Sequence, residues 1–108
     1  LSEKIRRARE TVVEIGKFKF TIRRPTEVEM IDFSRDPRPR DLLRHVIGWE
    51  GVSEIDLVPG GDPHPLAFDA EALIEWITDN AEMFGRLVDA IVDLFHKHSQ
   101  SLDDTEKK

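Results

Sequence analysis

Hydrophobic and polar residues alternate along residues 11–24 of the chain. Val13 and Ile15 alternate with polar neighbours before Gly16-Lys17, and the alternation resumes afterwards with three more apolar residues, Phe18, Phe20 and Ile22. β-Branched and aromatic residues at every second position are typical of strands. A two-residue loop with glycine first is compatible with a type II′ turn. The pattern therefore predicts a β-hairpin, one face of which must pack on helices to be stable.

The spacing of apolar residues becomes helical after this hairpin. Thr26 and Glu29 stand three residues apart, as in a capping box, and predict a helix that ends near Arg35. Two prolines then interrupt the chain. The apolar residues between Asp41 and Ile47 predict a second, short helix that stops at Gly48.

The middle of the chain is rich in proline and glycine. Residues 53–66 include the run Pro59-Gly60-Gly61-Asp62-Pro63-His64-Pro65, which predicts an exposed loop. Trp49 precedes this loop and has two interpretations. It is either a core tryptophan that closes the end of the preceding helix, or a half-exposed aromatic anchor at a protein interface, where tryptophan is enriched.

The C-terminal part predicts a pair of helices. Asp69 is a favourable N-cap for the first, and Asp79 stands three residues before Glu82 at the start of the second. Between Glu82 and His98, apolar residues recur with helical period on one side: Met83, Phe84, Leu87, Val88, Ile91, Val92, Leu94 and Phe95. This apolar sector covers about half of the helical wheel, more than one packing contact requires. Either two neighbouring helices cover it, or part of it binds a partner.

These elements predict an α+β, mostly helical fold in which an N-terminal β-hairpin is followed by about four helices. We expect residues 1–10 to form a thinly apolar arm, either a short helix or a frayed segment. Residues 11–98 would form one globular domain, because the chain has only 108 residues. Residues 99–108 are polar and are expected to be disordered.

Composition narrows the functional classes. The chain has no cysteine and no apolar run long enough to span a bilayer, so we expect a cytoplasmic protein without disulfides or a membrane partner.

The net charge of −6 is unevenly distributed along the chain. Residues 1–50 carry twelve Lys and Arg against nine Asp and Glu, whereas residues 51–108 carry four against thirteen. The acidic half would repel phosphate backbones, which argues against a nucleic-acid partner. The two halves can instead present unlike faces to other proteins or to other copies of the chain.

Signatures of catalysis are scarce. The chain has no nucleophile-elbow serine, P-loop or dinucleotide fingerprint. His96 and His98 are two residues apart on a predicted helix, so they point to different faces and cannot hold one metal ion. We therefore predict a non-enzymatic protein with no catalytic, cofactor-binding or metal-binding residues. An alternative is a small enzyme that uses the loop acids Asp56 and Asp62.

Four segments, taken in order, resemble a known family. They are the strand-to-helix junction Phe20-Thr21-Ile22-Arg23-Arg24-Pro25-Thr26, the Gly-Trp segment Val46-Ile47-Gly48-Trp49-Glu50-Gly51-Val52, the segment Pro65-Leu66-Ala67-Phe68, and the acidic-aromatic helices from Asp69 to Phe95. Together they cover roughly residues 11–98, and the chain resembles the tail assembly chaperones of long-tailed bacteriophages and prophages.

The resemblance implies a function in the cytoplasm of the bacterial host. Such proteins bind the tape measure protein, keep its hydrophobic helices soluble, help to recruit tail tube subunits and are absent from the finished virion. They also self-associate, so a homo-oligomer is implied. A structural head–tail or minor tail protein is the alternative. The residues expected to bind partners are Trp49, Trp76, Phe84, Leu87, Val88, Ile91 and Phe95.

Overall fold

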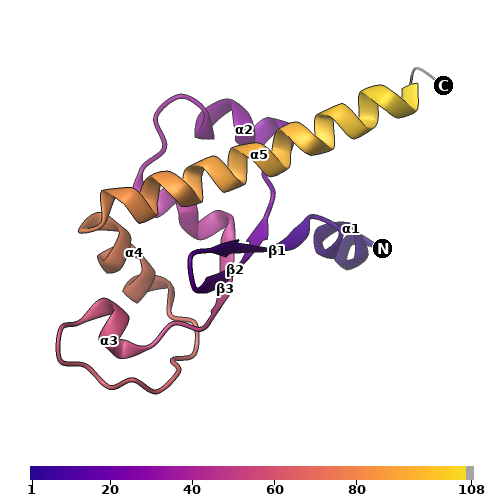
Figure 1. Ribbon diagram of the computed structural model, residues 1–108. Helices are drawn as coiled ribbons and strands as arrows, with labels where there is room; N and C mark the ends of the chain where they lie inside the picture. Colours follow the sequence, from indigo (N-terminus) through magenta and orange to yellow (C-terminus); the bar gives the residue numbers. More distant parts are fainter. Residues whose placement is uncertain (107–108) are drawn as a thin grey trace.

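The computed structural model describes residues 1–106, in which a small sheet is covered on one face by helices (Figure 1). The elements follow one another as α1 (Ser2–Arg7), β1 (Glu10–Ile15), β2 (Phe18–Arg23), α2 (Glu27–Phe33), the 3₁₀ helix η1 (Pro39–Arg44), β3 (Val46–Glu50), α3 (Glu54–Leu57), α4 (Ala70–Thr78) and α5 (Ala81–Glu106). This confirms the predicted α+β, mostly helical class with an N-terminal hairpin.

The hairpin forms where the alternation predicted it. β1 and β2 pair antiparallel with Ile15 opposite Phe18, which leaves Gly16 and Lys17 as the two loop residues. Gly16 has a φ of 61°, and no non-glycine residue in the described part of the chain has a positive φ. A type II′ turn requires this combination, because only its first central residue has positive φ.

A third strand corrects the prediction of a helix from Asp41 to Ile47. Only the first part of that segment is helical, as η1, and Val46–Glu50 pairs antiparallel with β2. The register shifts between Thr21 and Ile22, so that Val46 lies opposite Ile22 and Trp49 lies opposite Phe20. This β-bulge places inward-facing residues three apart along β3, a spacing that imitates a helix.

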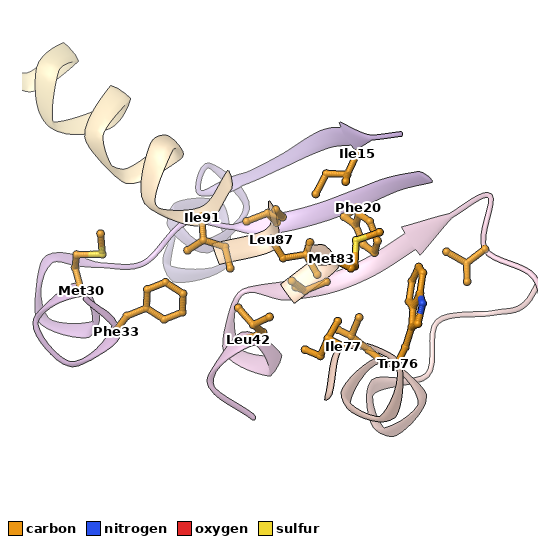
Figure 2. Close-up of a cluster of buried hydrophobic side chains, with 14 residues drawn as sticks. Ile15, Phe20, Met30, Phe33, Leu42, Trp76, Ile77, Met83, Leu87 and Ile91 are labelled. Atoms are coloured by element: carbon orange, nitrogen blue, oxygen red, sulfur yellow. The ribbon is translucent and has the colours of Figure 1, made fainter. Parts of the chain in front are cut away.

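The core lies between the inner face of this sheet and helices α4, α5 and η1 (Figure 2). β2 contributes Phe20 and Ile22, and α5 contributes Leu87 and Ile91; all four side chains are fully buried. On the opposite face of the sheet, Val12 is 59% exposed. The sheet therefore buries one face, as an antiparallel sheet of this size can do.

Helix α2 closes one end of this core. The Thr26 hydroxyl accepts a hydrogen bond from the Glu29 amide at 3.1 Å, and the Glu29 carboxylate accepts one from the Thr26 amide at 3.0 Å. The predicted capping box is confirmed. The helix ends at Phe33, which is buried together with Met30.

The C-terminal helices form largely as predicted, with two corrections. The Asp69 carboxylate accepts hydrogen bonds from the amides of Glu71 and Ala72, which confirms it as the N-cap of α4. For α5, however, the Asn80 side chain rather than Asp79 accepts the capping hydrogen bond, from the Met83 amide at 3.1 Å.

The second correction concerns the C-terminal segment. Residues 99–106, predicted to be disordered, continue α5, because extending an existing helix costs less than starting one. Residues 107–108 of the predicted tail lie outside the described residues. The predicted N-terminal arm includes the short helix α1, and the strand that follows begins at Glu10.

Leu87 has no exposed surface, so replacing it by alanine leaves a cavity in the core. The change should lower the free energy of unfolding by about 2–5 kcal/mol. Leu102→Ala is the matched control on the same helix, since this leucine is 44% exposed. We expect the control to cost less than about 0.5 kcal/mol in urea denaturation. Equal costs for the two substitutions would contradict the assignment of Leu87 to the core.

Candidate functional site

The residues predicted to bind partners lie mostly within the core. Leu87 and Ile91 have no exposed surface and Trp76 is 9% exposed. The other four, Trp49, Phe84, Val88 and Phe95, are partly buried against the same cluster. The centre of the wide apolar sector of α5 is thus covered from inside the domain, and its margins are partly buried. The prediction that Leu87 and Ile91 contact a partner is wrong, because a partner cannot reach them in the folded chain.

Trp49 holds a loop against the sheet. It lies on β3 rather than at a helix end, and its indole N–H donates a hydrogen bond to the Leu66 carbonyl at 3.0 Å. Its ring contacts those of Phe68 and Trp76 edge-on, with centroids 5.0 and 6.4 Å away. Trp49 therefore does not close a helix end, and the groups that it contacts in the structure belong to the same chain. Its contact with another protein stays a prediction.

The segment after β3, predicted as an exposed loop, folds back on itself around a short helix. Ser53 pairs with Pro65 in an isolated β-bridge, and Asp56 accepts a hydrogen bond from the Ser53 amide at 2.8 Å at the start of α3. Lys17 of the hairpin forms a 2.7 Å ion pair with Asp56. Burial alone would raise the pKa of Asp56, but the hydrogen bonds from Lys17 and Ser53 outweigh it and lower that pKa.

A tight turn completes this segment. The Gly61 amide donates to the Val58 carbonyl at 2.9 Å, with Pro59 and Gly60 at the two central positions. Gly60 has a φ of 80°, as the third residue of a type II turn requires. A Cβ on Gly61 would stand 2.9 Å from the backbone carbonyl oxygen of Glu54, so the turn packs directly on α3.

Between this turn, α3 and α4 lies a groove with a volume of about 540 Å³. Its lining consists of Ile55, Asp56, Leu57, Val58, Pro59, Ala72, Glu75, Trp76, Asp79 and Asn80. We call this set the α3–α4 groove. Ile55 and Val58 are 49% and 53% exposed, which is high for apolar side chains facing a common hollow.

The charge of the groove is acidic. Its lining includes three carboxylates and no Lys, Arg or His. Asp56 is already paired with Lys17, whereas Glu75 and Asp79 form no ion pair within the part of the chain that the structure describes. The groove therefore combines an apolar surface with two carboxylates that remain available to a cationic partner.

Of the groove residues, the predicted partner-binding set included only Trp76, and the alternative enzyme hypothesis named Asp56. Ile55 and Val58 were missed because they fell within a segment predicted as a loop. The signal that could have found them is Ser53 followed three residues later by Asp56, the spacing of a helix start, with an apolar residue at Ile55. Nothing in the local pattern indicates that α4 lies across from them.

His45 is the one buried histidine among the described residues, and it lies beside a separate, small cavity of about 100 Å³. Its Nδ1–H donates to the Arg23 carbonyl at 3.2 Å, and its ring packs edge-on against Phe33. Burial lowers the pKa of His45; the Glu29 carboxylate and the Arg23 carbonyl oppose this shift without cancelling it. The contacts make His45 part of the packing between η1 and α2.

The acids of the alternative enzyme hypothesis hold the loop together. Asp56 caps α3 and pairs with Lys17, and Asp62 accepts a hydrogen bond from the His64 amide at 2.8 Å. Residues 1–106 bring together no group of three or more side chains suited to a metal ion. Within the same range, no helix has both the length and the apolar character needed to cross a membrane.

Comparison of the chain with protein-family models, with curated proteins and with solved structures finds no match. The assignment of function therefore depends on the chain's own residues and on the α3–α4 groove.

Gly61→Ala should destabilise the turn that forms one wall of the groove, because its Cβ would collide with the backbone of α3. Gly85→Ala is the matched control, since a Cβ on Gly85 in α5 meets no atom within 4 Å. We expect Gly85→Ala to raise the free energy of unfolding by about 0.5–1 kcal/mol and Gly61→Ala to lower it by about 1–3 kcal/mol. Thermal unfolding measures both. A neutral Gly61→Ala would contradict the close approach of the turn to α3.

The stability of the protein should fall as the pH drops below about 6.5, the ordinary pKa of histidine. In this range the unfolded chain protonates His45 while the folded chain does not, because burial lowers the pKa of the folded state. The unfolded state then binds more protons, so the free energy of unfolding decreases until the pH passes the folded pKa. Urea denaturation between about pH 5 and 8 measures the slope.

The control for this measurement is a second histidine substitution. His64 is exposed in the loop, so His64→Gln should keep the pH dependence attributed to His45, whereas His45→Gln should remove it. An unchanged slope in His45→Gln would show that other groups cause the loss of stability.

Proposed function

We propose that the protein is a phage tail assembly chaperone, acting in the bacterial cytoplasm, that binds hydrophobic helical segments of the tape measure protein in the α3–α4 groove. The observation that carries this proposal is the exposure of Ile55 and Val58 beside two unpaired carboxylates in one hollow. The family resemblance of the sequence suggests which partner is bound. The groove suggests how, and it replaces the α5 face as the surface to test.

The lining of the groove suits an amphipathic helix. Such a helix presents apolar side chains three or four residues apart, and these can fill the space beside Ile55, Val58 and Trp76. A basic residue on its flank would meet Glu75 or Asp79. Charge complementarity of this kind favours correct partners and faster association more than it adds affinity. Weak, reversible binding is what a chaperone needs, because it must release the bound segment during assembly.

The acidic surface supports the same function. Residues 51–108 carry thirteen Asp and Glu against four Lys and Arg. A high net charge keeps a complex that covers hydrophobic segments in solution. The acidic helices also leave a surface for a second partner, and we propose that this partner is the tail tube protein. In this proposal the protein binds and releases its partners without catalysis.

Co-expression with the tape measure protein tests the proposal. The wild-type chain should raise the soluble fraction of that protein severalfold, and Val58→Asp should remove most of the gain, because it places a charge where the apolar segment binds. Val28→Asp is the matched control: Val28 is 76% exposed but lies on α2, outside the groove. We expect this control to act like the wild type.

Two results would count against the proposal. A tape measure protein that is equally insoluble with and without the chain would contradict the chaperone function. Detection of the chain in purified virions would favour the alternative, a structural head–tail or minor tail protein.

A further inference from the structure

Strand β1 forms an open edge of the sheet. The strand order is β1-β2-β3, so β1 has a neighbouring strand on one side only within residues 1–106. The other edge of the sheet lies beside the loop, because the Trp49 indole of β3 donates to the Leu66 carbonyl. On β1, by contrast, Val12 is 59% exposed and Glu14 is exposed as well. A further strand could therefore approach the sheet from the side of β1.

The register of the hairpin determines which backbone groups face this side. Ile15 and Phe18 flank the two-residue loop and are a directly opposed pair that exchanges both backbone hydrogen bonds. Such pairs alternate along antiparallel strands, so the backbone of Val13 also bonds to β2, whereas that of Val12 and Glu14 points away. No backbone group outside the sheet bonds to Val12 or Glu14 in the part of the chain that the structure describes. We call the outward backbone groups of Val12 and Glu14 the β1 edge.

A hollow of about 490 Å³ lies beside this edge, between the hairpin loop and α5. Its lining combines apolar surface from Ile15 and Ala90 with three carboxylates and one arginine. The arginine and one of the carboxylates already have ion-pair partners on α5. The other two carboxylates, Glu14 and Asp89, form no ion pair among the described residues. Every second side chain of an added strand would point to this inner face of the sheet.

The charges along β1 restrict what can pair with it. Glu10, Val12 and Glu14 lie on its outer face, so that face presents an acid, an apolar residue and an acid. Two copies of β1 paired antiparallel about Val12 would place Glu10 of each opposite Glu14 of the other, and like charges directly opposite are destabilising. Basic residues in a different strand would form favourable pairs instead. Glu10 is already paired with Arg23 at 3.3 Å, so Glu14 contributes most to this preference.

We propose that the β1 edge binds an extended, basic segment of another protein as a fourth strand of the sheet. In such β-strand addition, main-chain hydrogen bonds supply the affinity and alternate side chains supply the specificity. The matching segment has an apolar residue opposite Val12 and a lysine or arginine opposite Glu14, with Asp89 available to a second basic side chain from the inner face. The residues that line this hollow are not among those that line the α3–α4 groove, so the proposal does not depend on the chaperone function.

A synthetic peptide tests the proposal. In this probe threonine alternates with lysine, valine and lysine, so one face presents a valine between two lysines, and both ends are blocked. Hydrogen exchange followed by NMR should show fast exchange of the Val12 and Glu14 amides in the free protein. Saturation with the probe should slow both by about tenfold or more. The Val13 amide is the internal control, because it already bonds to β2 and should change little.

Two control peptides separate backbone pairing from attraction by charge. The first has glutamate in place of lysine and should bind about tenfold more weakly or less, because it meets Glu14 with a like charge. The second keeps the lysines but carries N-methyl groups on the lysine and valine amides, which removes the donors that face β1. It should not bind. If it binds like the probe, charge alone attracts the peptide and the inference is wrong.

Substitutions on β1 provide the matched test on the protein. Val12→Pro removes the outward N–H but no hydrogen bond to β2, and proline is tolerated where an edge N–H faces solvent. We expect it to weaken binding of the probe by about tenfold or more, whereas Val12→Thr keeps the amide and should bind like the wild type. Glu14→Lys should reverse the preference in favour of the glutamate peptide, a result that does not require Val12→Pro to fold.

Three results would overturn the inference. Absence of binding at millimolar probe would show that the charges on β1 only guard an edge strand against aggregation. Equal binding by Val12→Pro and Val12→Thr would exclude pairing through the β1 edge. Slow exchange of the Val12 amide without peptide, together with a mass that rises with concentration, would show that a second copy occupies the edge. Val58→Asp, which alters the α3–α4 groove, should bind the probe like the wild type, so this proposal and the proposed function can fail separately.

Discussion

The central strand β2 has a neighbour on each side but needs a hydrophobic cover on only one face. Phe20 and Ile22 on that face are fully buried, and the side chains that cover them come mainly from α4, α5 and η1. α5 supplies part of this cover through Leu87 and Ile91, which lie in the same buried cluster as Phe20 and Ile22. The apolar sector of α5 is wide because it faces both the sheet and its neighbouring helices. Its width therefore reflects the internal architecture of the domain.

This arrangement leaves the proposed interaction surface to a part of the chain with little regular structure. Because the centre of the apolar face of α5 packs in the core, the exposed apolar side chains that line the groove come from the segment between β3 and α4. They are Ile55 and Val58. The loop keeps its shape through the Ser53–Pro65 bridge, the Lys17–Asp56 ion pair and the Trp49 hydrogen bond to Leu66. A binding surface made this way can be adjusted without disturbing the core, as is common for loops on a rigid scaffold.

Local signals predicted the local features. The Gly16 turn, the Thr26 capping box and the Asp69 N-cap each depend on residues within four positions of one another, and the structure contains all three. β3 was missed because Val46 and Ile47 stand four positions after Leu42 and Leu43 and so continue a helical spacing, although both are β-branched. The groove was missed because residues on α3 and α4 meet only after the intervening loop has closed. A contact between segments that are far apart in the chain produces no periodic pattern of apolar residues in the sequence.

The two tryptophans have a consequence for observing the molecule. The chain contains no tyrosine, so Trp49 and Trp76 account for nearly all of its near-ultraviolet absorption. Their rings lie 6.4 Å apart at an interplanar angle of 83°, one fixing the loop to the sheet and the other lining the groove. Emission and near-ultraviolet circular dichroism therefore arise almost entirely from one wall of the molecule. The unlabelled protein thus carries an intrinsic optical probe at the place where a partner would arrive.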